Sequence, residues 1–207
     1  MWKWILLLVL LLVVPNPFWW NIRLIDVIQN FFVKGLHFTK LVPLNLDTCR
    51  DNLFVFDDVM KDLGLPYWLS EGTALGVIRD SAFLPWDDDV DTGMTCHHKE
   101  RFVSEALPRL RDNGFTLTFV TNRETFFGLF RNGEKVDVDF ACEDTKCQAC
   151  RTSHAKCETC DEMIPYLHGI HSVDFLGRTF LVPGEDYLCH LYGPMWRIPD
   201  KKKDLMV

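Results

Sequence analysis

The chain has 207 residues, of which 48% are hydrophobic and 25% charged, which is the composition of one ordinary globular domain with a short appendage. Its net charge of −7 lacks the basic excess of a nucleic-acid-binding protein, so we expect no nucleic-acid partner. A nucleotide substrate is compatible with this charge, because divalent cations can hold phosphate groups next to carboxylates.

The first 20 residues have the pattern of a secretory targeting segment. Lys3 precedes an apolar run over residues 4–14, and a cluster of aromatic residues ends at Trp20. The run is short for a bilayer span, which needs roughly 20 residues, but extension to Trp20 nearly reaches that length. We therefore expect residues 1–20 to form a retained signal-anchor, with the folded part in the secretory lumen. A cleaved signal peptide and a buried helix of the domain are the alternatives.

Residues 21–46 mix apolar and polar residues and are interpreted as a stem, which leads into a folded domain over residues 47–200. The domain is expected to open with a helix that Asp47 caps and that ends at Leu63. Apolar residues in this stretch fall on one helical face, and Gly64 follows it. The next expected elements are a strand over 66–70, a short helix over 72–79, a strand over 88–94, a helix over 97–113 that Pro108 can kink, and a strand over 115–120.

The clearest local pattern is the dipeptide Asn132-Gly133 between two strand-like runs, which span residues 126–131 and 134–140. Asn-Gly between such runs is a strong signal for a hairpin with a type I′ turn. Strands and helices alternate irregularly along the chain, which indicates an α+β or mixed α/β fold. The remaining expected elements are a hairpin over 173–182 that turns at Gly177-Arg178, a helix over 185–192 and a basic tail over 201–207.

Two aspartates on one predicted strand indicate a metal site. Asp89 and Asp91 are two residues apart, and side chains alternate across a strand, so both carboxylates point to the same face. Carboxylates this close repel each other, and a bound Mg²⁺ or Mn²⁺ removes that repulsion, because hard cations prefer carboxylate oxygen. Asp87 and Asp88 are expected at the surface or behind the metal ligands. A solvated acidic turn and a structural Ca²⁺ loop over residues 87–91 are the alternatives.

A second strand offers a third carboxylate. Asp137 and Asp139 alternate with apolar residues over 136–140, so the apolar set marks the core face and the acidic set marks the other face. If this strand lies beside the Asp89 strand, Asp137 completes the metal site, and a carboxylate there can accept the proton of an attacking hydroxyl. The exposed face of a hairpin is the alternative for both residues.

A phosphate-binding turn precedes the aspartates. Gly72 and Thr73 stand where a strand gives way to a helix, and backbone N–H groups at a helix N-terminus attract anions. Arg79 has the planar fork that matches phosphate oxygens, and Trp86 can stack on a base or form a wall of the pocket. A surface position for Arg79 and a core position for Trp86 are the alternatives. The candidate substrate-binding residues are Gly72, Thr73, Arg79, Trp86, Asp88 and Asp139.

Eight cysteines, an even number, are compatible with disulfides in an oxidising lumen. Five of them fall in a cysteine-rich insert over residues 142–162, which contains two Cys-x2-Cys pairs. This pattern suits a tetrahedral Zn²⁺ site, and disulfides are the competing interpretation; either role is structural. The candidate zinc ligands are Cys147, Cys150, Cys157 and Cys160.

Residues 67–76 and 85–91 closely resemble the LicD/fukutin family. Residues 136–138 are similar to that family's third-carboxylate strand and residues 191–194 to its C-terminal motif, so the resemblance covers about residues 50–200. It implies a nucleotidyltransferase-like mixed sheet flanked by helices, with the cysteine-rich segment as an insert.

Members of this family transfer a phospho-alcohol, such as ribitol phosphate or phosphocholine, from a CDP-activated donor to a glycan. The resemblance implies the same reaction here, with a glycan or glycoprotein acceptor in glycoconjugate synthesis. It also implies Asp89 and Asp91 as Mg²⁺ or Mn²⁺ ligands and Asp137 as the third carboxylate. Lys3 and the few charges after the apolar run favour a single-pass type II protein with a luminal catalytic domain. Together with the resemblance, this predicts a location in the Golgi or ER membrane; secretion is the alternative.

Glu71 departs from the family pattern, in which many members have glycine at this position. The departure affects the phosphate-binding turn and therefore the expected donor site. A non-catalytic scaffold of the same fold, which binds a glycan or a partner transferase, is the alternative function. An oligomer is also compatible with the sequence.

Overall fold

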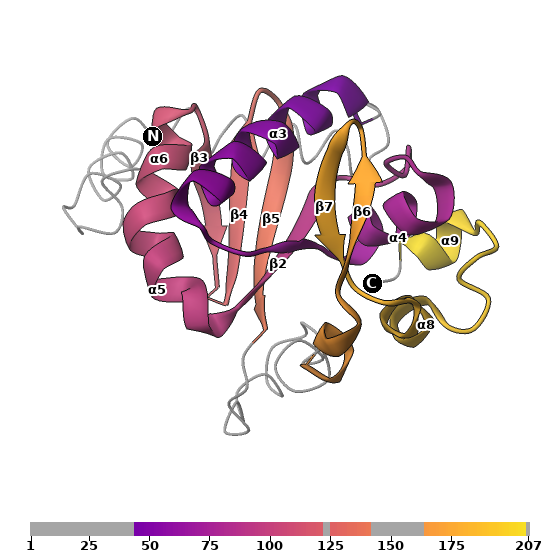
Figure 1. Cartoon of the computed structure of the whole chain (residues 1–207). Helices are drawn as coiled ribbons and strands as arrows, with labels where there is room; N and C mark the ends of the chain where they lie inside the picture. Colours follow the sequence, from indigo (N-terminus) through magenta and orange to yellow (C-terminus); the bar gives the residue numbers. More distant parts are fainter. Residues whose placement is uncertain (1–43, 122–124, 142–163, 206–207) are drawn as a thin grey trace, which may run out of the picture.

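The computed structural model describes residues 44–121, 125–141 and 164–205, and its centre is a five-stranded mixed sheet (Figure 1). The strand order is β1-β2-β5-β4-β3, and a separate hairpin of β6 and β7 lies beside this sheet. The mixture of strands and helices confirms the predicted α+β (mixed α/β) class. The strands are β1 Trp68–Leu69, β2 Val90–Thr95, β3 Thr116–Val120, β4 Phe126–Arg131, β5 Glu134–Ala141, β6 His171–Phe175 and β7 Arg178–Val182.

The predicted adjacency of the two aspartate strands is confirmed, because β2 and β5 are parallel neighbours. Asp91 is the partner of Asp137 across the two strands, and Gly93 is the partner of Asp139. Residues two apart on a strand share a face of the sheet. The acidic residues of both strands therefore meet on one face and at the same end.

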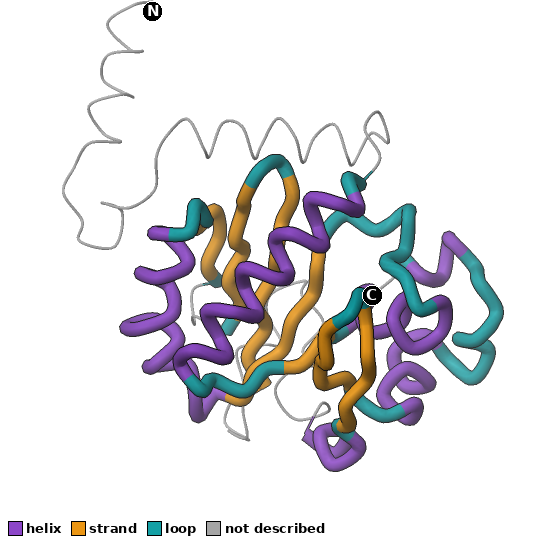
Figure 2. Tube along the Cα trace, turned by 45° about the horizontal axis from the view of Figure 1, so that its top comes forward, coloured by secondary structure: helices purple, strands orange, loops and turns teal. Residues whose placement is uncertain are grey.

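Helices cover the opposite, apolar face of the sheet (Figures 1 and 2). Phe102 packs edge-to-face against Phe127 of β4 and Phe140 of β5, with ring centroids 5.4 and 5.5 Å apart. Such pairs contribute about 0.5–1.5 kcal/mol each beyond the burial of their area. The covering helices are α3 Leu46–Leu63 and a helical run made of a 3-10 turn Cys96–His98, α5 Lys99–Arg101, a π-helical turn Phe102–Ala106 and α6 Leu107–Asp112.

The N-terminal cap of α3 is Asn45, which corrects the prediction of Asp47. The side-chain oxygen of Asn45 accepts a hydrogen bond from the Thr48 N–H at 3.1 Å, which is the usual geometry of an N-cap. Asp47 lies inside the first turn and pairs with Arg50 at 3.0 Å instead. Gly64 ends the helix as predicted, with a φ of 61° that favours glycine.

Pro108 lies at the start of α6, directly after the π-helical turn. A proline has no N–H to donate to the carbonyl group four residues earlier, so the regular α-helical pattern cannot run through it unchanged. The helical run changes its hydrogen-bonding pattern at this point, as single π turns within α-helices do.

The turn at Asn132-Gly133 confirms the predicted type I′ hairpin, since the two residues have φ values of 54° and 97°. The second hairpin turns at Leu176 and Gly177, with φ values of 54° and 83°, one residue earlier than predicted. A type I′ turn needs positive φ at both central positions, and glycine takes the second of them in each hairpin. Arg178 is therefore already part of β7.

The β1 edge of the sheet carries a second hydrophobic cluster, in which Trp68, Leu75 and Tyr187 are buried. This cluster lies between β1 and the helices drawn beside the β6–β7 hairpin in Figure 1. It holds the start of α4 against β2, where the predicted site residues are concentrated. The remaining helices are α4 Glu71–Asp80, a 3-10 helix Ile164–Gly169, α8 Glu185–Tyr192 and α9 Lys201–Asp204, which begins the predicted basic tail.

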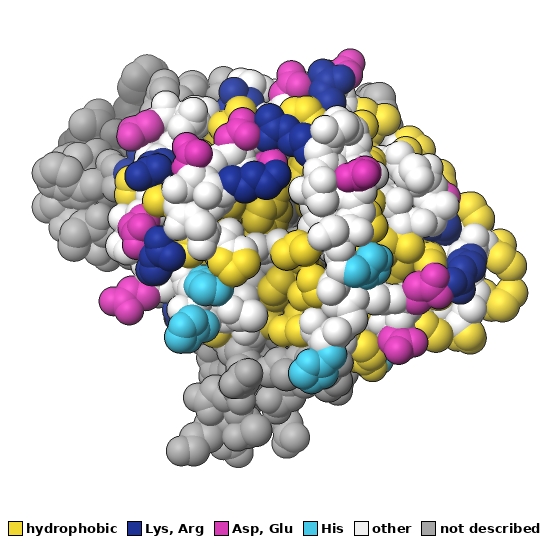
Figure 3. All heavy atoms as spheres, in the orientation of Figure 1, with side chains coloured by type: hydrophobic (Ala, Val, Ile, Leu, Met, Phe, Trp, Pro, Cys, Tyr) yellow, Lys and Arg dark blue, Asp and Glu magenta, His cyan; other side chains and the backbone are white. Residues whose placement is uncertain are grey.

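Three predictions lie outside the described residues: the anchor over 1–20, nearly all of the stem over 21–46, and the cysteine-rich insert over 142–162. Within the part of the chain that the structure describes, none of the helices is long and apolar enough to cross a bilayer. On the face that carries α3, acidic and basic side chains are interspersed (Figure 3).

Candidate active site

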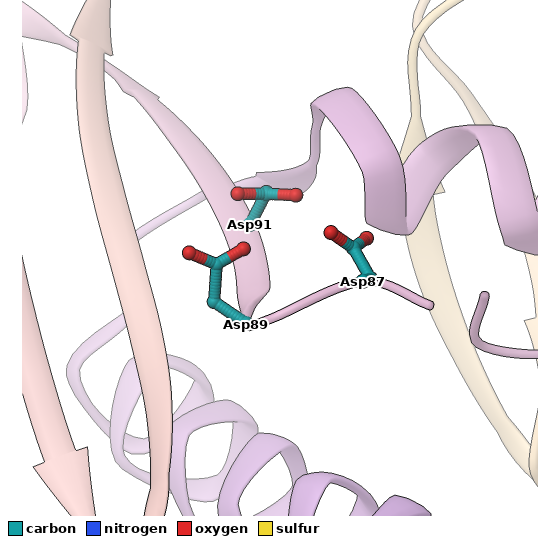
Figure 4. Close-up of side chains that lie close together, drawn as sticks. All are labelled: Asp87, Asp89 and Asp91. Atoms are coloured by element: carbon teal, nitrogen blue, oxygen red, sulfur yellow. The ribbon is translucent and has the colours of Figure 1, made fainter. Parts of the chain in front are cut away.

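Three aspartates at the start of β2 form a compact acidic cluster (Figure 4). Asp87 and Asp89 lie in the loop that leads into β2, and Asp91 lies in the strand itself. Each offers one carboxylate oxygen, and these oxygens lie within 4.8 Å of one another. β2 begins at Val90, so Asp89 precedes the strand that was predicted to contain it.

The N-terminus of α4 orients Asp91. The Asp91 N–H donates a hydrogen bond to the Thr73 Oγ1 at 2.8 Å, and the Thr73 N–H donates to the Asp91 Oδ2 at 3.3 Å. These reciprocal bonds join the first turn of α4 to the first residues of β2. Thr73, predicted to contact phosphate, thus positions a carboxylate of the cluster.

Gly72 allows Asp87 to approach the start of α4. A Cβ atom at Gly72 would overlap the Asp87 Oδ2 atom, so a side chain here would displace the carboxylate. Glycine is the residue that permits such a close approach. The predicted phosphate turn and the acidic cluster are therefore one continuous site.

The cluster is electrostatically unfavourable without a cation. Burial raises the pKa of Asp87 to about 8, and the neighbouring Asp89 adds to the shift. Burial and the charge of Asp89 also raise the pKa of Asp91 well above its usual value. A divalent cation favours the ionised form of each ligand, and an all-oxygen donor set suits Mg²⁺ or Mn²⁺. The three residues therefore fit the predicted metal.

Lys135 of β5 is a member of the site that the sequence analysis missed. Its ammonium group lies 2.6 Å from the Asp137 Oδ2 and also contacts the Asp89 carboxylate. Burial alone would lower the pKa of Lys135, but the charges of Asp89 and Asp137 outweigh that effect and raise it. The sequence signal was its place in the alternation, since Lys135 precedes Asp137 and Asp139 by two and four residues.

The predicted metal ligands Asp89, Asp91 and Asp137 differ from the set that the geometry brings together. Asp87, expected at the surface or behind the ligands, contributes an oxygen to the cluster. Asp137 lies beside Asp91 in the strand pairing and is joined to Asp89 through Lys135. The regular spacing of aspartates at 87, 89 and 91 was the available signal for Asp87.

Arg79 forms ion pairs and a hydrogen bond within the folded domain. Its side chain is 4% exposed and pairs with Asp204 at 3.0 Å and with Asp80 at 2.9 Å. Its guanidinium also donates to the Trp196 carbonyl at 3.2 Å. These contacts do not support the predicted role of Arg79 in binding phosphate.

The other predicted substrate-binding residues surround the cluster. Trp86 is partly buried against the second hydrophobic cluster, and its Nε1 has no hydrogen-bond partner among the described residues. Asp88 is exposed, and its N–H donates to the Asp87 Oδ1 at 3.1 Å. Asp139 is enclosed, and burial raises its pKa to about 6 although the Phe140 N–H donates to it.

The described cysteines differ in their state. Cys96, which directly follows β2, is disulfide-bonded. Cys49 is a buried free thiol and Cys189 an exposed one. The candidate zinc ligands lie outside the described residues, so that prediction stays open.

Comparison with known proteins agrees with this geometry. The family model described as "LicD/FKTN/FKRP, nucleotidyltransferase domain" matches residues 64–185. The human ribitol-5-phosphate transferase FKTN is 29% identical over 154 residues, which are 70% of this chain and 32% of that protein. The lipopolysaccharide cholinephosphotransferase LicD of Haemophilus influenzae is 38% identical over 55 residues, which are 27% of this chain and 21% of that protein. The chain thus spans about a third or less of these relatives.

A solved structure extends the likeness to the fold. The solution structure of the antibiotic-resistance factor ANT(2'')-Ia matches with a TM-score of 0.51 and 14% identity, over 77% of this chain and 80% of that protein. An identity this low shows the fold alone, and that fold is nucleotidyltransferase-like. Because the family model covers more than half of the sequence, the chain belongs to the LicD/FKTN/FKRP nucleotidyltransferase domain family.

Proposed function

We propose that the chain is a metal-dependent phosphotransferase that moves a phospho-alcohol from a CDP-linked donor to a glycan or glycoprotein acceptor. The observation that carries the proposal is the cluster of Asp87, Asp89 and Asp91 against the first turn of α4. Relatives named for ribitol-5-phosphate transfer and for cholinephosphate transfer support this reaction class. The phosphoryl chemistry is the same whichever alcohol is carried.

The residues of the site have separate roles in such a reaction. Asp87, Asp89 and Asp91 would hold Mg²⁺ or Mn²⁺, which when bound offsets charge on the donor phosphates and on the departing CMP. Thr73 keeps the Asp91 carboxylate oriented through its two hydrogen bonds. In this proposal Asp137, the strand neighbour of Asp91, accepts the proton of the attacking hydroxyl.

Thermal unfolding of the full chain with Mn²⁺, with CDP and with both tests this proposal. A ligand that binds only the folded state raises its stability, by about 2.7 kcal/mol at a hundred times the Kd. We expect the largest shift with both ligands, and we expect Asp89→Asn to abolish it. Asp62→Asn, on the exposed side of α3, is the matched control and should keep the shift.

A non-catalytic scaffold is the second candidate, and the position of Lys135 favours it. The ammonium group already neutralises Asp89 and Asp137, as an internal cation would. A scaffold would show no shift with Mn²⁺ and CDP in any combination. That result would contradict the enzyme proposal.

We further propose that the catalytic domain faces the secretory lumen, anchored in the Golgi or ER membrane by residues 1–20 or secreted after their removal. The Cys96 disulfide supports an oxidising compartment. A glycosylation acceptor sequence added after Val207 provides the test. Addition of a glycan in cells supports the luminal address, and an unmodified protein would contradict it.

A further inference from the structure

A small cavity with both polar and aromatic lining residues lies on the acidic face of the sheet, next to the aspartate cluster. Its walls come from β1, β2, β5 and the starts of α4 and α8, and they include Trp68, Ser70, Glu71, Gly93, Asp139 and Tyr187. Asp139 and Gly93 are strand partners two residues beyond the Asp137–Asp91 pair. The cavity is therefore about 7 Å further along the strands from the carboxylates of the cluster.

Two buried polar groups, on residues that line this cavity, have no hydrogen-bond partner among the described residues. They are the Trp68 Nε1 and the Ser70 Oγ, on residues that are 5% and 3% exposed. Ser70 is the N-cap residue of α4, yet its side chain makes no capping hydrogen bond. Buried polar groups are almost always paired in folded proteins. Both groups therefore point to an occupant that would complete them.

The backbone around the cavity is also unusual. Glu71 has a φ of 41°, which a residue with a side chain rarely adopts, and its N–H donates to the Tyr187 hydroxyl at 3.3 Å. Trp68 lies across Gly93 so closely that a Cβ atom there would overlap the indole ring. Strained backbone of this kind concentrates at ligand sites. These features bring Trp68, Glu71 and Asp139 together around one small cavity.

The hydrogen-bonding groups of the lining residues and the size of the cavity favour a hydroxyl group as its occupant. The Trp68 N–H can only donate a hydrogen bond, and the Asp139 carboxyl group offers oxygens that accept one. A group that contacts both residues must therefore accept one hydrogen bond and donate another. The space has room for little more than one water-sized group. A hydroxyl meets both conditions. A trimethylammonium group meets neither, because it is larger and has no donor or acceptor.

We propose that this cavity binds one hydroxyl of the alcohol carried by the donor, so that the chain uses a polyol phosphate in preference to phosphocholine. The inference rests on the proposed function. Ser70 and Glu71 directly precede Gly72 and Thr73, which touch the carboxylates expected to hold the donor phosphates through the metal. A hydroxyl on a short carbon chain attached to that phosphate is within reach of the cavity.

Calorimetric titration of the full chain in Mn²⁺ with CDP-ribitol, CDP-choline and CDP provides the test. We expect the unaltered chain to bind CDP-ribitol more tightly than the other two ligands. Ser70→Ala removes one partner of the hydroxyl and should weaken CDP-ribitol about 5- to 10-fold while CDP affinity is unchanged. Ser172→Ala, on exposed β6, is the matched control and should change nothing.

The remaining outcomes of the titration distinguish a failure of the hydroxyl-binding cavity from a failure of the proposed function. If CDP binds with Mn²⁺ but Ser70→Ala weakens all three ligands equally, or none of them, the cavity holds a structural water and this inference is overturned. Tighter binding of CDP-choline than of CDP-ribitol would overturn it as well. If none of the ligands binds the unaltered chain, the proposed function fails and the inference fails with it. The thermal midpoint of Ser70→Ala without ligand checks that the variant is folded.

Discussion

The ammonium group of Lys135 is enclosed between two carboxylates, and removing it tests what holds the site together without metal. The side chains of Lys135, Asp89 and Asp137 are 13%, 11% and 7% exposed. Removal of one partner from a buried ion pair typically costs about 3–5 kcal/mol, because the remaining charge is left uncompensated. We expect Lys135→Met to lower the free energy of unfolding by about this amount in EDTA, measured by urea denaturation.

Mn²⁺ should restore part of this stability, since a cation at the neighbouring cluster compensates Asp89, which both sets of contacts share. The matched control is Arg101→Met, which breaks an exposed pair with Glu105 that contributes little to stability. If Lys135→Met is as harmless as Arg101→Met, the Lys135 contacts do not hold the site together.

The raised pKa values of the buried aspartates predict a pH dependence of stability. Burial raises the pKa to about 8 for Asp87 and to about 6 for Asp139 in the folded chain. The pKa of an aspartate in the unfolded chain is about 4. Between these values the folded state binds more protons than the unfolded state, so the free energy of unfolding falls as the pH rises. The metal-free chain should therefore unfold at lower urea concentration at pH 8 than at pH 5.

Asp87→Asn should flatten this dependence, because the amide does not titrate. The comparison is made from urea midpoints in EDTA at both pH values. A midpoint for the unaltered chain that rises with pH would show that the carboxylates are not protonated in the folded state.

At the scale of elements, local signals in the sequence predicted one hairpin turn and one helix end correctly, and the turn of the second hairpin to within one residue. Asn132-Gly133 predicted its hairpin because type I′ turns need positive φ at both positions, and Gly64 predicted the end of α3 in the same way. The cap of α3 was misassigned, because Asn45 and Asp47 are both good capping residues and only the backbone path decides between them.

Long-range arrangement was less predictable. The alternation of Asp137 and Asp139 indicated an acidic face, and the adjacency to β2 was predicted, but the register that pairs Asp91 with Asp137 depends on tertiary packing. The inclusion of Asp87 and Lys135 follows from how the loop before β2 meets α4 and β5. The spacing of the aspartates and the alternation of Lys135 with Asp137 are short-range signals, but the contacts themselves depend on tertiary packing.

The junction of α4 with the β2 loop provides a prediction at this scale. In Gly72→Ala the new methyl group would displace the end of the Asp87 side chain, which is flexible enough to move at small cost to the fold. We expect a midpoint close to that of the unaltered chain and a clear loss of the stabilisation by Mn²⁺. Gly184→Ala, where a Cβ meets only ordinary contacts, should keep the full Mn²⁺ effect. Equal Mn²⁺ effects in both variants would exclude Asp87 from the metal site.

At the scale of the whole molecule, ion pairs to buried aspartates join segments that are far apart in the sequence, one pair through α3 and one through α4. Arg178 of the β6–β7 hairpin pairs with Asp57 of α3 at 3.0 Å. Arg79 of α4 pairs with Asp204 of α9 at 3.0 Å, 125 residues away. The same helix that orients Asp91 at its start is thus held by the C-terminal segment at its end.

The two interpretations of Arg79 make opposite predictions for a single variant. As a link between α4 and α9, with both side chains under 5% exposed, Arg79→Met should lower the free energy of unfolding by about 3–5 kcal/mol. It should leave the additional stabilisation by Mn²⁺ and CDP unchanged, and Asp204→Asn should behave in the same direction. As a phosphate contact, Arg79→Met would instead reduce the CDP-dependent shift, whereas Asp204→Asn would not. Urea denaturation without ligands measures the free energy of unfolding, and its repetition with Mn²⁺ and CDP measures the added stabilisation. If only Arg79→Met loses that added stabilisation, Arg79 contacts the substrate phosphate.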